Sequence, residues 1–236
     1  MSSHHRSIQG PEHSGRVYPY RAVEERLLSG LPAGARILDL GCSEGANLTR
    51  LAARGHVIGV DASLQRLVEA RRTAPVAAGV GERLPFAGGS FDLVYVSHVL
   101  HHASDHRVVL GEIHRVLKPD GAVLIVETFD DNPAVRLARN LRIGWDSDRV
   151  PSRFRFEGLI SDVERSGFHV EERGQFNVVY WVWDVAQIKV PRLARLVHAA
   201  EQLEMAAAQR FRRFSAHGYI LARPRGETPG RHLHAG

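Results

Sequence analysis

The chain alternates between short apolar runs and longer stretches in which apolar residues recur at helical spacing. Such an alternation is typical of buried parallel strands that are joined by crossover helices. The apolar runs predict strands at 37–40, 56–60, 76–80, 91–97, 122–127, 168–172 and 216–222. The helical stretches lie at 21–29, 47–54, 63–72, 156–167 and 191–214, and another helix is expected to end in the turn 117–121. The pattern therefore predicts an α/β protein built on one sheet.

Composition and charge are those of an ordinary globular chain. Of the 236 residues, 44% are hydrophobic and 24% are charged, and the net charge is +5. No lysine-rich or aromatic-interleaved stripe is present, so a nucleic-acid partner is not favoured. Cys42 is the only cysteine, which excludes a disulfide framework. The sequence has neither a signal peptide nor a long apolar span, so we expect a soluble cytoplasmic protein with no membrane partner.

The turn after the first strand narrows the class of ligand. Dinucleotide sites use G-x-G-x-x-G, in which the middle glycine lets the backbone approach a pyrophosphate. Here the turn starts at Gly41, Ser43 takes the middle position, and the acid Glu44 stands near the helix start. Asp61 ends the second strand, about 20 residues past the first glycine, where nucleoside-binding folds hold a ribose diol. The turn therefore favours a nucleoside that carries positive charge over a ligand that carries a pyrophosphate.

Three segments resemble a known family. The pattern D-L-G-C-x-x-G at 39–45, with Asp61 downstream, resembles the first two motifs of class I S-adenosylmethionine-dependent methyltransferases. Segments 79–102 and 112–127 are similar to regions of the small-molecule methyltransferases related to the ubiquinone and menaquinone biosynthesis enzymes. The resemblance implies a Rossmann-like, doubly wound and mostly parallel sheet of seven strands in the order 3-2-1-4-5-7-6. It also implies helices on both faces and a lid insertion.

The resemblance implies S-adenosylmethionine as the cofactor and S-adenosylhomocysteine as the product. Asp61 is expected at the ribose and Asp39 near the methionine ammonium, although helix capping by Asp61 and a structural role for Asp39 stay open. Val80 replaces the family's acid after the third strand, which leaves backbone groups of the next two residues for the adenine edge. The implied cofactor-binding residues are Asp39, Gly41, Cys42, Ser43, Gly45, Asp61, Ala62, Gly81, Glu82, Ser97 and His98.

The catalytic candidates are His98, His101 and His102, which follow the fourth predicted strand. A neutral imidazole can take a proton from a hydroxyl at cellular pH, so each can act as a general base. Simple packing is the alternative for each of them. The spacing of His98 and His102 can ligate zinc on a helix, but no carboxylate completes an H-E-x-x-H motif. No metal site is therefore predicted.

The weakly matching parts of the chain are expected to receive the acceptor. The methyltransferase domain is predicted to span 17–222, between a disordered tail at 1–16 and a flexible tail at 223–236, with lid and acceptor elements at 129–155 and 176–213. Trp181 and Trp183 alternate on a predicted strand there, and they form either core or a wall for an apolar or aromatic acceptor. The predicted activity is methyl transfer to a small molecule in biosynthetic or secondary metabolism. The alternatives are an RNA or protein methyltransferase and a cofactor-binding domain that transfers no methyl group.

Overall fold

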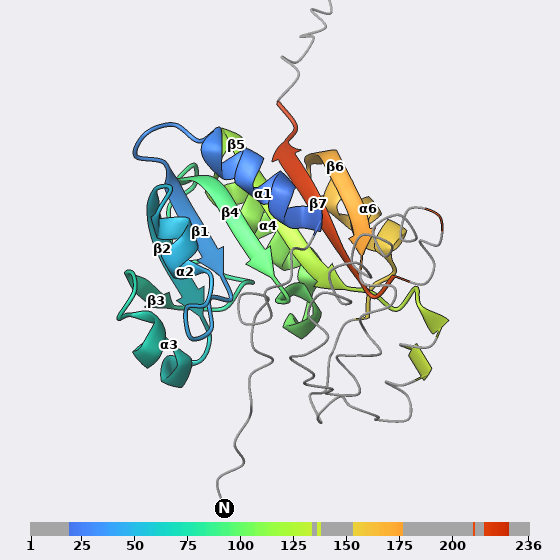
Figure 1. The fold of residues 1–236 in the computed structure, drawn as a ribbon, viewed down its shortest axis with the longest axis horizontal. Coiled ribbons are helices and arrows are strands. Elements are labelled where there is room, and N and C mark those ends of the chain that lie inside the picture. Colours follow the sequence, from blue (N-terminus) through green and yellow to red (C-terminus); the bar gives the residue numbers. More distant parts are fainter. Residues whose placement is uncertain (1–18, 134–135, 138–152, 177–209, 211–214, 227–236) are drawn as a thin grey trace, which may run out of the picture.

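The computed structural model describes residues 19–133, 136–137, 153–176, 210 and 215–226. Within these residues, seven strands form one sheet in the order β3-β2-β1-β4-β5-β7-β6, as Figure 1 shows. The strands are β1 (Arg36–Leu40), β2 (His56–Asp61), β3 (Val76–Ala78), β4 (Phe91–Ser97), β5 (Leu117–Thr128), β6 (Phe168–Phe176) and β7 (His217–Pro224). Strands β1 to β5 pair in parallel, and β7 runs antiparallel to both β5 and β6. The predicted sheet order is confirmed.

Helices cover both faces of the sheet (Figure 1). They are α1 (Pro19–Ser29), α2 (Leu48–Ala52), α3 (Leu64–Ala70), the 3-10 turn η2 (Leu100–His102), α4 (His106–Val116) and α6 (Phe156–Arg165). Successive strand residues point to opposite faces, so Ile37 joins the core under α1, α2 and α3 while Leu38 joins the core under α4 and α6. Both residues are fully buried, as parallel strands between two helix layers require. Among the described residues, no helix has the length and apolar character needed to cross a membrane.

Several element ends differ from the sequence prediction, and strand pairing explains the largest differences. The segment 117–121 was expected as a helix end and a turn, but it forms the first part of β5, where Leu117 pairs with Phe91 before the register shifts. Strand β6 extends to Phe176 because it pairs with β7 as far as His217. Strand β3 stops at Ala78. Helix α2 is shorter than predicted, whereas α3 begins as expected with Ser63 as its N-cap.

The carboxyl ends of β1, β2, β4 and β5 lie together along one edge of the sheet. Leu40 is in register with Val60 of β2 and with Val96 of β4, so the segments that follow these strands emerge side by side. Chain order reverses between β1 and β4, because β1 has β2 on one side and β4 on the other. Open α/β sheets bind ligands in the crevice at such a switch point.

Candidate functional site

The turn after β1 uses its own backbone donors. Gly41 and Cys42 both donate their N–H groups to the Val60 carbonyl, at 2.7 and 2.9 Å. The amide of Ser43 donates to Asp61 Oδ2 at 2.9 Å, and that of Gly45 donates to the Cys42 carbonyl at 2.8 Å. A pyrophosphate site needs backbone N–H groups that point at the ligand. These four amides are occupied, which agrees with the sequence argument against a dinucleotide.

The backbone of this turn requires conformations that favour glycine. Gly41, Ser43 and Gly45 have φ values of 75°, 50° and 93°. A Cβ atom on Gly41 would lie only 2.1 Å from Cγ2 of Val99, which follows β4. The turn and the segment after β4 are therefore in direct contact, and the absent side chain of Gly41 permits it.

Asp61 holds the turn against the end of β2. Its Oδ2 accepts from Ser43 N at 2.9 Å, and its Oδ1 accepts from Ser63 N at 2.8 Å. Ser63 in turn caps α3 by accepting from the amide of Arg66 at 3.4 Å. An ionised carboxylate offers about four acceptor positions, so about two remain for the hydroxyls of a ligand. The capping role considered for Asp61 is thus observed, and it is compatible with a role at a ribose.

The turn lies in a region of negative potential. Asp39 is buried in the middle of β1, and Cys42, also buried, lies between Asp39 and Asp61. Burial and the charges of these two carboxylates together raise the pKa of the Cys42 thiol to about 12. Burial is the larger cause and disfavours any charge, whereas the two carboxylates specifically favour a cationic ligand group. The electrostatics therefore match a ligand that carries a sulfonium or an ammonium.

The residues expected at the adenine lie near one another, but their side chains are used in different ways. Val80 is half exposed and forms an isolated bridge with Arg83. Glu82 Oε1 accepts from the amide and the hydroxyl of Ser104, at 2.9 and 2.8 Å. A Cβ atom on Gly81 would lie 3.0 Å from Val109 of α4, and Ala62 is exposed after β2. Backbone contacts from these residues to an adenine stay a prediction.

The segment after β4 begins with a strained residue. Ser97 ends β4, and His98 has a φ of 56°, which residues other than glycine rarely adopt. His98 donates its N–H to the Val126 carbonyl at 2.9 Å, and its Nδ1 lies 3.2 Å from Thr128 Oγ1. Strain of this kind typically costs about 1–3 kcal/mol and gathers at functional sites. The outlier therefore marks the end of β4 as a functional candidate.

Glu127 is the site residue that the sequence argument missed. It is fully buried near the end of β5, and its carboxylate accepts from the amides of Val99 and Leu100 at 2.8 and 2.7 Å. The amide of Thr128 and Nδ1 of His101 lie 3.2 and 2.7 Å from its other oxygen. Burial raises the pKa of Glu127, but the hydrogen bond and charge of His101 outweigh it and leave the pKa lowered. The only sequence signal was an acid that directly follows a buried apolar run.

The three predicted histidines lie together. The ring of His102, which is exposed, lies 4.1 Å from that of His101 between centroids, and the ring of His98 lies 6.3 Å from it. Ligand atoms of His98, His101 and Glu127 all lie within 4.8 Å of one another, a grouping that invites a metal interpretation. Glu127 already accepts from three amides and one imidazole, so a metal would have to displace these donors. The geometry therefore favours a hydrogen-bonded network.

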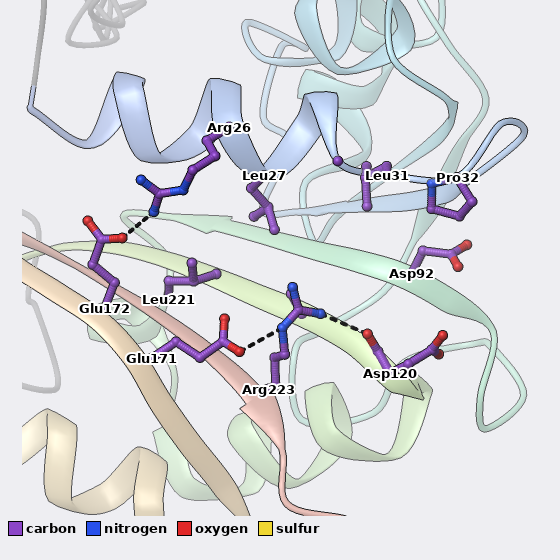
Figure 2. A pocket seen from close by; sticks show the side chains of 12 residues that line it. Arg26, Leu27, Leu31, Pro32, Asp92, Asp120, Glu171, Glu172, Leu221 and Arg223 are labelled. Atoms are coloured by element: carbon purple, nitrogen blue, oxygen red, sulfur yellow. Dashed lines mark hydrogen bonds and ion pairs between the residues drawn. The ribbon is translucent and has the colours of Figure 1, made fainter.

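A separate hollow lies at the opposite edge of the sheet (Figure 2). It has a volume of about 450 Å³ and lies between the end of α1 and the amino ends of β4 and β5. Its charged side chains largely bond one another: Arg26 contacts Glu172, and Arg223 contacts Glu171 and the Asp120 carbonyl. None of the predicted site residues lines it. The candidate site is therefore at the carboxyl edge.

Most of the predicted acceptor elements lie outside the described residues, including most of the lid at 129–155, Trp181 and Trp183. Phe176 is an exception, because it ends β6 and is buried. Its ring stacks on that of His217, with centroids 5.7 Å apart and an interplanar angle of 20°. The ring of His217 also meets that of His98 edge-on at 5.4 Å. These rings extend the site from β4 towards β7.

Comparison with known proteins agrees with this geometry. Residues 38–125 match a family described as a methyltransferase domain. The chain is 35% identical over 132 residues to the malonyl-[acyl-carrier protein] O-methyltransferase of Legionella pneumophila, covering 52% of this chain and 45% of that protein. It is 38% identical over 100 residues to the demethylmenaquinone methyltransferase of Mycobacterium sp. (strain KMS), covering 42% and 44%. The chain thus spans less than half the length of these two relatives.

The fold is also shared with a solved structure, an S-adenosylmethionine-dependent methyltransferase from Mesorhizobium loti. The TM-score is 0.60 at 22% identity, and the match covers 84% of this chain and 96% of that one. The family resemblance predicted from the sequence is confirmed.

Proposed function

We propose that the chain transfers a methyl group from S-adenosylmethionine to a small-molecule acceptor, as a class I S-adenosylmethionine-dependent methyltransferase does. The premise is the match of residues 38–125 to a methyltransferase domain and the shared fold. The observation that carries the proposal is the turn after β1. Its amides at Gly41, Cys42, Ser43 and Gly45 are occupied by acceptors within the protein, and two carboxylates contribute to the raised pKa of Cys42. A phosphate finds these four donors occupied and two carboxylates nearby, whereas those carboxylates favour a sulfonium and an ammonium.

Several of the predicted residues have a role in this proposal. Asp61 accepts from the ribose hydroxyls with the acceptor positions that Ser43 and Ser63 leave open. Asp39 supplies negative charge for the methionine ammonium from within β1. Ser97 and His98, at the end of β4, flank the methionine and the methyl group. The turn after β1 lies beside them, because Gly41 has no side chain to keep it away from the segment after β4. When bound, the cofactor supplies an electrophilic methyl group on a sulfonium.

A small-molecule acceptor is supported by the relatives. One is named for demethylmenaquinone, a small molecule, and one for malonyl-[acyl-carrier protein], a small acyl group carried by a protein, so the two relatives are named for different acceptors. The match ends at residue 125, before the predicted lid and the second acceptor element. Specificity for the acceptor is therefore expected beyond residue 125. A role in biosynthetic or secondary metabolism and a cytoplasmic location stay predictions.

Calorimetry and a transfer assay together test the proposal. S-adenosylhomocysteine should bind the full chain, and NAD should bind far more weakly. Release of S-adenosylhomocysteine from S-adenosylmethionine should then rise with small hydroxylated or amine acceptors, and not with bulk RNA or an unfolded protein mixture. Tight binding of NAD without a response to S-adenosylhomocysteine would refute the cofactor. Binding without transfer to any small molecule would leave a cofactor-binding domain or a macromolecular methyltransferase.

A further inference from the structure

The carboxylate of Glu127 is saturated with donors. An ionised carboxylate offers about four acceptor positions. Oε1 receives the amides of Val99 and Leu100, and Oε2 receives the amide of Thr128 and faces His101 Nδ1 at 2.7 Å. A protonated carboxyl group would have to donate a hydrogen bond, and of its four partners only His101 Nδ1 could accept one. The hydrogen bond and charge of His101 lower the pKa of Glu127, which favours the ionised form. Glu127 is therefore ionised, and it holds the segment after β4 by three of its members.

An ionised Glu127 fixes the proton on the ring of His101. Because the carboxylate can only accept, Nδ1 must donate, and in the neutral ring the lone pair then belongs to Nε2. Within the part of the chain that the structure describes, Nε2 has no recorded hydrogen-bond partner. His98 differs, because its Nδ1 faces the hydroxyl of Thr128, which can donate or accept. Side chains of β5 therefore determine which ring nitrogen carries the lone pair in His101, but not in His98.

We propose that Glu127 positions His101 as the general base of the transfer, and that the acceptor is a phenol or enol hydroxyl on a flat ring. This inference rests on the proposed function. The side chain of His101 is about 15% exposed, so Nε2 is sheltered but not sealed. It stands two residues from Val99, whose side chain touches the cofactor turn at Gly41. A base in this place lies at the switch point where the methyl group is expected.

The surroundings favour a neutral flat acceptor over a cationic one. The stacked rings of His217 and Phe176 lie at the same edge, and the ring of His98 packs edge-on against His217. The carboxylates that follow β5 each face an arginine: Asp130 lies 3.8 Å from Arg153, and Asp131 lies 3.8 Å from Arg155. The carboxylate of Glu127 is buried and saturated. An ammonium would find few available carboxylates here, whereas an aromatic ring can pack against the exposed ring of His98 and the half-buried ring of His217.

The reaction balances with these groups alone. His101 Nε2 takes the hydroxyl proton as the acceptor oxygen forms a bond to the methyl carbon. The bond between that carbon and the sulfonium sulfur breaks, and its electron pair stays on sulfur. The products are a methyl ether, neutral S-adenosylhomocysteine and an imidazolium that later releases its proton to water. The positive charge of the sulfonium thus passes to His101, where Glu127 stabilises it.

The decisive variant is His101→Asn. The asparagine amide can still donate to Glu127, so the segment after β4 keeps its anchor, but the variant has no basic nitrogen. With catechol and hydroquinone as acceptors, S-adenosylhomocysteine release at saturating cofactor should fall by about 10²–10⁴-fold. Cofactor affinity should stay within about twofold. The matched control is His56→Gln, which removes an exposed histidine at the amino end of β2 and should keep full activity.

Two further readouts separate a base from a structural ring. Side-chain ¹⁵N NMR should show the Nδ1–H form of His101 in the native chain, and Glu127→Gln should abolish it. The rate with catechol should depend less on pH in the native chain than in His101→Asn, whose rate should keep rising towards the pKa of a phenol near 10. The titratable groups that face His101 are Glu127 from β5 and His98 and His102 from its own segment, and His217 faces His98.

The outcomes distinguish this inference from the proposed function. If no acceptor turns over although the cofactor binds, the proposed function fails first. If phenols turn over equally well in His101→Asn, or if His101 carries its proton on Nε2, His101 is not the base. If benzylamine and aniline are methylated while the hydroxyl compounds are not, the acceptor class is wrong. Binding of added Zn²⁺ that is lost in Glu127→Gln would overturn the hydrogen-bonded network in favour of a metal centre.

Discussion

The role of Asp61 at the cofactor can be measured, because the structure shows what else its carboxylate does. The Asp61→Ala variant loses two hydrogen bonds, from the amides of Ser43 and Ser63. Hydrogen bonds to a charged acceptor contribute about 1.5–3 kcal/mol each, and the same range applies to the ribose hydroxyls. We expect the affinity for S-adenosylhomocysteine to fall by about 2 kcal/mol or more, which is roughly thirtyfold. Calorimetry on the folded variant gives this number directly.

A loss of affinity alone does not separate a ribose contact from a damaged turn, so the ligand is varied as well. The 2′,3′-dideoxy analogue of S-adenosylhomocysteine lacks the hydroxyls that Asp61 is expected to bind. If the contact exists, removing the hydroxyls should cost the native chain about 2 kcal/mol or more and the Asp61→Ala variant almost nothing. Equal losses for both ligands on substitution of Asp61 would show that the carboxylate acts only on the turn.

The chain offers a matched control for the loss of a partly buried acid. Asp92 accepts from the amide of Arg36 at 2.8 Å and from Lys118 Nζ at 2.7 Å, at the amino edge of the sheet. Asp92→Ala thus also removes two hydrogen bonds to a carboxylate, one from a backbone amide and one from a lysine, far from the carboxyl edge. It should lower the thermal midpoint and leave the affinity for S-adenosylhomocysteine unchanged. A similar loss of affinity in both variants would mean that cofactor binding reports only general stability.

Three further predictions follow from the same contacts. Gly41→Ala should cost about 2 kcal/mol or more of unfolding free energy, because its Cβ would meet Val99 at a φ of 75°, and adding Val99→Ala should restore part of this in denaturant titrations. Cys42, whose pKa is raised to about 12, should resist Ellman's reagent at pH 8 until guanidinium is added. Asp162 has a lowered pKa, because His106 and Arg107 outweigh its burial, so it stabilises the fold above the ordinary Asp value of 3.8. Asp162→Asn should therefore destabilise at pH 7, and the difference should shrink as pH falls below that value.

The cofactor half of the site could be predicted from the sequence because its signals are local. A buried strand, the turn at Gly41 and the acid at Asp61 lie within 25 residues, and the periods of strand and helix fix their relative positions. The structure has the strand, the turn and the acid in the expected order and adds the bond between Asp61 and the Ser43 amide, while their contacts to a cofactor stay a prediction. Residue types alone do not tell where the turn amides point or which acceptors they bond, since both depend on how β1 pairs with β2.

Glu127 could not be predicted, because its partners are distant in sequence. In the sequence it is one more acid after an apolar run, which also describes an acid exposed at a strand end. Its role comes from pairing of β4 with β5, which brings Val99 and His101 to it from 26 to 28 residues away. The lengths of β5 and β6 were missed for the same reason. Phe176 and Leu117 are strand residues only because partner strands extend to them.

The end of β5 explains how a histidine with positive φ is held in place. Glu127 and Thr128 are consecutive strand residues, so their side chains point to opposite faces of the sheet. One contacts His101 and the amides of the 3-10 turn, and the other contacts His98. The segment after β4 is therefore anchored from both faces by two neighbouring side chains. The strained backbone of His98 persists only because the surrounding contacts impose it. Side chains of this segment that are held so firmly can keep their alignment to an acceptor. The same anchors tie the segment to Gly41 through Val99, so the cofactor turn and the histidines are expected to move as one unit.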